Sequence, residues 1–133
     1  LKKLMELQLS MNKLKTIEKN MFSVLINLKN LNLEENLIQI IEAECFRYNE
    51  KLEILTLKNN KIKFIGKNAF SGTLIQIGNN LANQNLQYLD ECAFCGIQIT
   101  EQTLDLSNNI LSDLKNKTFK GLSNLIAIKL NNN

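Results

Sequence analysis

The chain has no histidine, proline or tryptophan, and only five glycines and three cysteines among its 133 residues. Without histidine it cannot form a Ser-His-Asp or Cys-His catalytic arrangement, and it lacks the commonest metal ligand. It also has no glycine-rich phosphate loop and no credible pair of nucleophile and base. We therefore predict that the protein is not an enzyme, that it has no catalytic residue and that it binds no metal or cofactor.

Long apolar runs and a strong charge of one sign are also missing. No window approaches the about 18 uninterrupted apolar residues that a membrane-spanning helix needs. Fifteen lysines and one arginine face 13 acidic residues, which gives a net charge of only +3. That excess is small and dispersed, so it does not indicate a nucleic-acid-binding protein. We predict no nucleic-acid partner and no membrane contact by this segment.

The three cysteines are too few for a small disulfide scaffold, so the core must come from apolar packing. Cys92 and Cys95 lie on either side of Phe94 with C-x-x-C spacing. A zinc site would need a second ligand pair, which is absent. Two semi-buried thiols and a local disulfide both remain open at this point. Cys45 lies nearly two repeats earlier, too far away for a bridge.

Leucine and asparagine are abundant, with 24 and 21 residues. Phenylalanine marks a repeat, with spacings of 24, 24, 24 and 25, at Phe22, Phe46, Phe70, Phe94 and Phe119. Asparagine marks a second phase with a step of 24 at Asn12, Asn36 and Asn60, and again between Asn109 and Asn133. A repeat of this length predicts a solenoid of stacked units.

Between these markers the sequence follows the pattern L-x-x-L-x-L-x-x-N-x-L-x-x-I-x-x-x-x-F-x-x-L. The L-x-L alternation predicts a short strand with one buried face. Such a strand cannot bury its apolar face alone, whereas stacked neighbours can. We therefore read residues 1–133 as a single domain, with units at about 4–27, 28–51, 52–71, 72–100, 101–124 and 125–133.

This pattern resembles the leucine-rich repeat family in its 24-residue form. The resemblance implies an α/β solenoid, a right-handed horseshoe with a parallel sheet on the concave face and turns and short helical segments on the convex face. It also implies a column of inward-facing asparagines that satisfies backbone groups where the chain turns. We assign this column to Asn12, Asn36, Asn60, Asn80, Asn109 and Asn133.

The fourth unit is irregular. The segment LIQIGNN at 74–80 mirrors LTLKNN and LDLSNN, so we predict a strand at Ile75 and Ile77 with Asn80 in the asparagine column. A register that keeps the 24-residue step would put Asn79 where a buried leucine belongs, and we disfavour it. The preferred register makes residues of about 81–85 bulge on the outer side.

The resemblance implies ligand contacts on the open face of the strands. By phase, this face carries Glu6, Gln8, Ser10, Asn32, Glu34, Thr56, Lys58, Gln76, Asp105, Ser107 and Lys129. The implied function is recognition of a protein or extracellular pattern ligand, in an extracellular or cell-surface receptor or adhesion protein of the Toll-like or Slit-like kind, with a role in innate immunity. The alternative is a cytoplasmic scaffold built on the same repeat, which suits the absence of cysteine-rich caps.

Both ends of the chain interrupt a repeat, and the sequence contains one glycosylation sequon. Leu1 occupies the last position of a preceding repeat, and Asn133 stops a repeat at its column residue. We therefore expect a piece of a longer solenoid whose open ends favour pairing into a homodimer. Asn116 begins the N-x-[ST] sequence Asn-Lys-Thr, a glycosylation acceptor if the protein is secreted.

Overall fold

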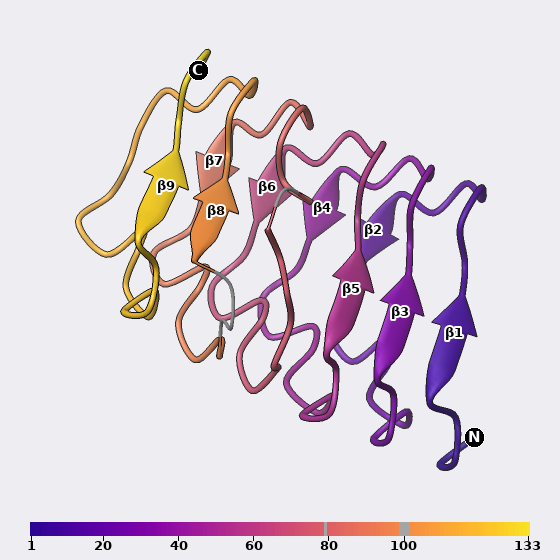
Figure 1. Cartoon of the computed structure of the whole chain (residues 1–133). Helices are drawn as coiled ribbons and strands as arrows, with labels where there is room; N and C mark the ends of the chain where they lie inside the picture. The colour runs from indigo at the N-terminus through magenta and orange to yellow at the C-terminus, as the bar shows by residue number, and fades with distance from the viewer. Residues whose placement is uncertain (79, 99–101) are drawn as a thin grey trace.

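In a computed structural model, which describes residues 1–78, 80–98 and 102–133, the chain winds into stacked coils (Figure 1). Parallel strands from successive coils form two walls that run along the stack, although not every coil has a strand in both walls. The two termini lie at opposite ends of this stack (Figure 1). The chain is thus a solenoid of parallel strands, as the sequence predicts. The Asn79 of the disfavoured register and the boundary at residues 100 and 101 between two predicted units lie outside the described residues.

The first wall contains the strands that the L-x-L pattern predicts. Strands β1 (Glu6–Gln8), β3 (Asn30–Asn32) and β5 (Ile54–Thr56) form one parallel sheet, and β8 (Thr103–Asp105) and β9 (Ala127–Lys129) form another. In the first sheet Leu7 pairs with Leu31 and Leu31 with Leu55, one repeat apart. Both flanking positions of each strand point outward, as a two-residue alternation requires.

A second wall of strands was not predicted. Strands β2 (Thr16–Ile17), β4 (Ile40–Ile41), β6 (Phe64–Ile65) and β7 (Tyr88–Leu89) form a four-stranded parallel sheet behind the first wall (Figure 1). The β-branched and aromatic residues that recur at these positions favour strands. That composition was the available signal, but two-residue strands have too little alternation to be read from periodicity.

The predicted short helices are wrong for the part of the chain that the structure describes, which has turns there instead. In the first coil the N–H groups of Met21, Ser23 and Leu25 each donate to a carbonyl three residues earlier. Asn20 has a φ of 63°, and Glu44 has a φ of 56° one coil later. A residue in this left-handed region cannot continue an α-helix, so the segment stays a chain of turns.

Phenylalanine rings fill the core beside these turns. The rings of Phe22, Phe46, Phe70 and Phe94 stack with centroids 5.9, 6.1 and 6.1 Å apart. Each ring belongs to a different coil, so the stack runs along the solenoid axis. This spacing is within the favourable range for aromatic pairs. Removing one ring would therefore leave a cavity between two coils.

Side-chain amides connect successive coils where the first wall ends. Asn60 Nδ2 donates to the carbonyl of Leu33 in the previous coil at 2.9 Å, and Asn60 Oδ1 accepts the N–H of Ile38 at 3.0 Å. Asn36, Asn109 and Asn133 make the equivalent contacts, whereas Asn12, in the first coil, donates only to carbonyls of its own coil. The column thus satisfies backbone groups that the turn would otherwise leave buried and unpaired.

In the fourth coil the column residue is Gln84, so the prediction of Asn80 was wrong. Gln84 Nε2 donates to the carbonyl of Leu57 at 3.0 Å, and Gln84 Oε1 accepts the N–H of Ile62 at 3.4 Å. Glutamine carries the same amide head group as asparagine, so it can take over both contacts. The hydrogen bonds therefore keep the step of 24 residues from Asn60 to Gln84, and Leu81 rather than Ile77 takes the position of Leu57. The register that we preferred from the sequence is thus wrong. The predicted outward bulge at about 81–85 is wrong too, because Leu81 and Gln84 are buried.

Asn80 has a different role in this coil. Its Oδ1 accepts the N–H of Leu57 at 2.8 Å. One coil earlier, the equivalent N–H of Leu33 donates instead to a backbone carbonyl, that of Thr56. Ile75 and Ile77 are buried as predicted, but no strand forms there. A side chain thus replaces a strand carbonyl, and the first wall is interrupted between β5 and β8 (Figure 1).

Candidate functional site

The first wall brings most of the predicted ligand-contacting residues into two rows. Gln8, Asn32 and Thr56 are paired across β1, β3 and β5, and Asp105 is paired with Lys129 across β8 and β9. Ser10, Glu34, Lys58 and Ser107 each follow two residues after one of these positions, and Glu6 precedes Gln8. Gln76 is exposed but lies outside the rows. Its N–H donates to the carbonyl of Glu53, so Gln76 does not lie level with Thr56.

Asp105 is held in place by Ser107, which is largely buried. Ser107 donates to Asp105 Oδ1 from Oγ at 2.6 Å and from its backbone N–H at 2.9 Å, while Lys129 Nζ lies 4.0 Å from Oδ2. The Ser107 hydroxyl lowers the pKa of the Asp105 carboxyl, and the Ser107 N–H and Lys129 act in the same direction against the opposing effect of burial. Asp105 is therefore a fixed carboxylate at neutral pH.

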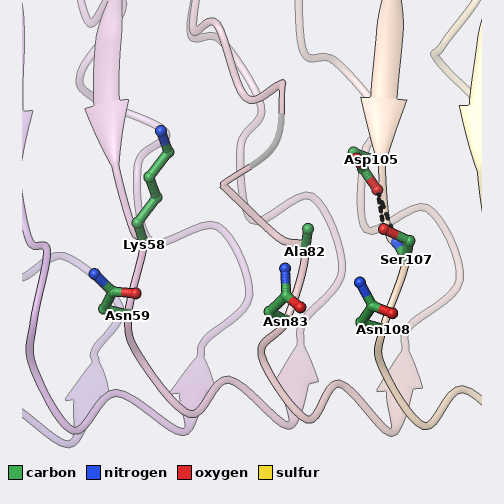
Figure 2. A pocket seen from close by; sticks show the side chains of 7 residues that line it. All are labelled: Lys58, Asn59, Ala82, Asn83, Asp105, Ser107 and Asn108. Atoms are coloured by element: carbon green, nitrogen blue, oxygen red, sulfur yellow. Dashed lines mark hydrogen bonds between the residues drawn. The ribbon is translucent and has the colours of Figure 1, made fainter. Parts of the chain in front are cut away.

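A hollow opens in the first wall where the sheet is interrupted. It has a volume of about 340 Å³, and it is lined by Lys58, Asn59, Ala82, Asn83, Asp105, Ser107 and Asn108. Figure 2 shows these side chains arriving from three successive coils, with Lys58 on one rim and Asp105 on the other. The lining offers amides and charges of both signs, which suits hydrogen bonding to a polar ligand.

The hollow exists because the fourth coil presents little side chain at this level. Asn80 occupies the position of Thr56 and Asp105 but turns inward to bond Leu57. Ala82 occupies the position of Lys58, and its side chain is a single methyl group. Sequence reasoning missed Ala82 and Asn83. Counting 24 residues on from Lys58 and Asn59 would have found them.

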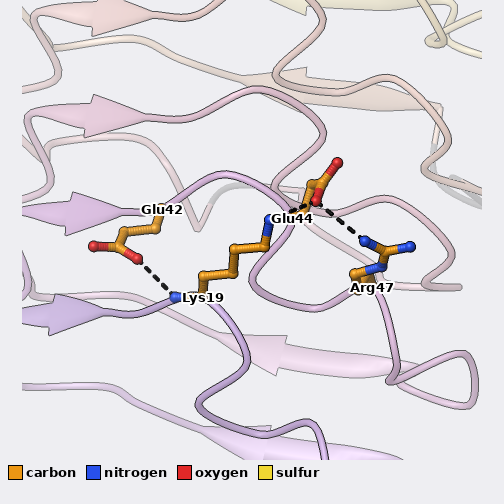
Figure 3. A network of polar contacts seen from close by, with 4 residues as sticks. All are labelled: Lys19, Glu42, Glu44 and Arg47. Carbon is orange, nitrogen blue, oxygen red and sulfur yellow. Dashed lines mark hydrogen bonds and ion pairs between the residues drawn. The ribbon is translucent and has the colours of Figure 1, made fainter.

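A network of charges joins the first two coils at the turn edge (Figure 3). Lys19 Nζ lies 2.9 Å from Glu44 Oε2, Arg47 Nη1 lies 3.3 Å from the same oxygen, and Glu42 accepts the backbone N–H of Lys19. The hydrogen bond from Lys19 is the main reason that the pKa of Glu44 is lowered. All four groups are accessible to water, so this network is a surface link between coils rather than a catalytic arrangement.

The cysteines divide into a pair and a single thiol. Cys92 and Cys95 form a disulfide within the turn after β7, the second of the two possibilities that the sequence left open. Cys45 is a buried free thiol, and burial raises its pKa. A thiol with a raised pKa is a poor nucleophile. Among the described residues no group of histidine, cysteine and acidic side chains could hold a metal ion.

The predicted acceptor Asn116 is exposed on the outer turn of its coil, whereas Thr118 of the same sequon is buried. The N–H of Thr118 donates to the carbonyl of Lys115, which holds this segment as a turn. Within the described residues, no helix has the length and apolar character that crossing a membrane would require.

Comparisons with known proteins agree with this architecture. A family model described as leucine rich repeat matches residues 26–74. A solved chain from the Toll–Spätzle complex, a molecular hub in Drosophila development and innate immunity, superimposes with a TM-score of 0.53 at 20% sequence identity. The match covers 96% of this chain but only 20% of the Toll chain, so this chain spans about a fifth of that protein. No curated protein sequence matches.

Proposed function

We propose that the chain is a protein-binding module that recognises its ligand on the first wall, because a leucine-rich repeat model matches residues 26–74 and the fold resembles part of Toll. The single observation that carries this proposal is the polar hollow at the break between β5 and β8. A flat row of strands offers a ligand little depth, whereas a hollow can enclose a side chain. Central, enclosed positions dominate the energy of protein interfaces.

The hollow favours a ligand segment with a polar side chain. Asp105 is already oriented by Ser107, so it loses little freedom when it binds a donor from the ligand. Lys58 has no ion-pair partner in the described part of the chain, and it can pair with an acid at the rim. Row residues such as Gln8 and Thr56 would then contact the rest of the ligand.

Phage-displayed random peptides, selected on the 133-residue chain, provide a test. Binding of the selected peptides should weaken at least about tenfold in Ala82→Trp, which fills the hollow from a half-buried position without entering the core. Ser123→Trp, at an exposed position of the turns, is the control and should leave binding unchanged. Peptides that bind Ala82→Trp as tightly as the parent chain would contradict a site in the hollow.

We also propose that the chain belongs to an extracellular receptor or adhesion protein. The disulfide between Cys92 and Cys95 supports this, because disulfides persist in oxidising compartments. The exposed sequon residue Asn116 is accessible to a glycan, and the Toll neighbour comes from a complex with another protein. Mass spectrometry of native material should find a glycan on Asn116 and an oxidised Cys92–Cys95 pair. An unmodified Asn116 with two reduced thiols would contradict this location.

The second candidate is an intracellular scaffold on the same repeat. The buried thiol of Cys45 favours it, since a free cysteine is unremarkable in a reducing compartment. In such a scaffold the ligand would bind the same first wall, but Cys92 and Cys95 should be reduced in native material. The measurement on native material therefore separates the two locations without involving the binding site.

A further inference from the structure

The second wall carries an apolar stripe on its outward face. Ile40, Phe64 and Tyr88 are paired directly across β4, β6 and β7, and each alternates with a buried residue of the core. The rings of Phe64 and Tyr88 are stacked, with centroids 5.6 Å apart and planes 7° from parallel. Ile40 is 41% exposed. Aromatic residues gathered on an outer face are typical of protein interfaces.

Opposite charges line the two sides of this stripe. On the side where the strands begin lie Lys15, Gln39, Lys63 and Gln87, and on the side where they end lie Glu18, Glu42 and Asp90. The carboxylate of Glu42 is visible beside its strand in Figure 3. Within the described residues neither Lys15 nor Lys63 has an ion-pair partner. The stripe is thus an apolar surface with one cationic and one anionic flank.

We propose that this stripe binds a second copy of the chain through a two-fold axis that runs parallel to the stripe. Rotation by 180° about an axis in the interface and along the stripe keeps the order of the coils but exchanges the two flanks. Lys15 then faces Glu18 of the second copy, and Lys63 lies one coil, about 4.8 Å along the stack, from Glu42 and from Asp90 of that copy. A two-fold axis perpendicular to the stripe would instead oppose like charges. The arrangement of charge therefore selects both the partner and the orientation.

Lys115 marks one end of this interface. Its Nζ lies 4.7 Å from the centroid of the Tyr88 ring and also bonds the Tyr88 hydroxyl. These contacts fix the ring against β7, so the second copy meets a rigid aromatic surface. Three outward side chains form a small interface core, so we expect a weak dimer whose population depends on concentration.

Sedimentation equilibrium of the 133-residue chain over a range of concentrations tests the proposal. The parent chain should approach twice its 15.2 kDa mass as concentration rises. Ile40→Glu should raise the dimer dissociation constant at least about tenfold. Ile26→Glu is the matched control, because Ile26 is 46% exposed but lies away from the stripe, and it should leave the constant unchanged.

A charge exchange tests the orientation. Lys15→Glu and Glu18→Lys should each weaken the dimer, since each creates a like-charge pair across the axis. The double variant with both changes should recover the parent constant, and added salt should reduce the differences. A monomer at every concentration would refute the dimer. Association that Ile40→Glu leaves intact but Ile126→Glu in the last coil abolishes would instead show end-to-end stacking. Failure of the double variant to recover would refute the parallel axis.

Discussion

Asn60→Ala provides the sharpest test of the amide column. The Asn60 side chain accepts the N–H of Ile38 and donates to the carbonyls of Leu33 and Leu57, all of which are buried contacts. Alanine cannot replace any of them. The Ile38 N–H is left buried without a partner, which costs about 1–3 kcal/mol, whereas the carbonyls of Leu33 and Leu57 keep the amides of Asn36 and Gln84 and lose one hydrogen bond each, at about 0.5–1.5 kcal/mol. We therefore expect a loss of about 2–6 kcal/mol, a large fraction of the roughly 5–15 kcal/mol that stabilises a typical domain.

Urea unfolding followed by circular dichroism measures this loss as a shift of the midpoint at constant slope. Asn59→Gly is the matched control, because Asn59 is exposed, and glycine accepts its φ of 56°. It should change the free energy of unfolding by less than about 1 kcal/mol. If Asn60→Ala is unfolded in buffer, trimethylamine N-oxide can restore folding so that the titration can begin from the native state.

The same measurement on Gln84→Ala tests the register of the fourth coil. Gln84 bonds the backbone of Leu57 and Ile62 as Asn60 bonds that of Leu33 and Ile38, so we expect a loss of similar size. Equal stability of Asn60→Ala and Asn59→Gly would refute the reasoning for the whole column. A normal midpoint for Gln84→Ala alone would refute the assignment of Gln84.

Three further predictions concern the core, the hollow and a turn. Leu57→Asp places a carboxylate at a fully buried position, so it should cost several kcal/mol, and full thermal stability by calorimetry would exclude the strand register. The pKa of Asp105 is lowered in the folded chain, so its carboxylate stabilises the fold above about pH 4, and this stabilisation is lost as the pH falls through the folded-state pKa. Ser107→Ala should therefore lower the free energy of unfolding at pH 7. Urea titrations near pH 2 should show that most of this effect has disappeared. If Ser107→Ala lowered the free energy of unfolding by the same amount at both pH values, the ionic contribution of Asp105 would be excluded. Gly66→Ala should lower the melting temperature by several degrees, because the new Cβ would lie 2.5 Å from the backbone nitrogen of Ala43, and an unchanged melting temperature would contradict that close approach.

The amino-acid sequence shows much of the fold because each coil repeats the same local requirement. The alternation of Leu55 and Leu57 predicts an inward strand face, and Asn60 three residues later predicts the amide that closes the turn. Those two inferences need only the residues of one repeat. The second wall was missed because strands such as β4 are two residues long, too short for alternation to be visible. The helical segments were predicted from the family and not from the residues, and left-handed residues such as Asn20 exclude them.

The candidate site was only partly accessible from sequence. The outward rows followed from phase, so Thr56, Lys58 and Asp105 could be named in advance. The hollow could not, since it results from a side chain that turns inward and from a methyl group where its neighbours carry longer chains. Ser107 was assigned to the open face by phase, but phase gave no sign that this residue would be largely buried with its hydroxyl donating to Asp105.

Periodicity by itself determined that the chain is a stack of coils, which side chains fill the core and where the asparagines recur, because these depend on local spacing. Only the tertiary structure decided the contacts between coils: that Gln84 takes the place of an asparagine, that Asn80 substitutes for a backbone carbonyl, and that Ile40, Phe64 and Tyr88 align on one outer surface. The physical reason is that a hydrogen bond or ring contact between coils joins residues about 24 positions apart. Whether such a contact forms depends on how the intervening chain is accommodated, and a local pattern contains no information on that.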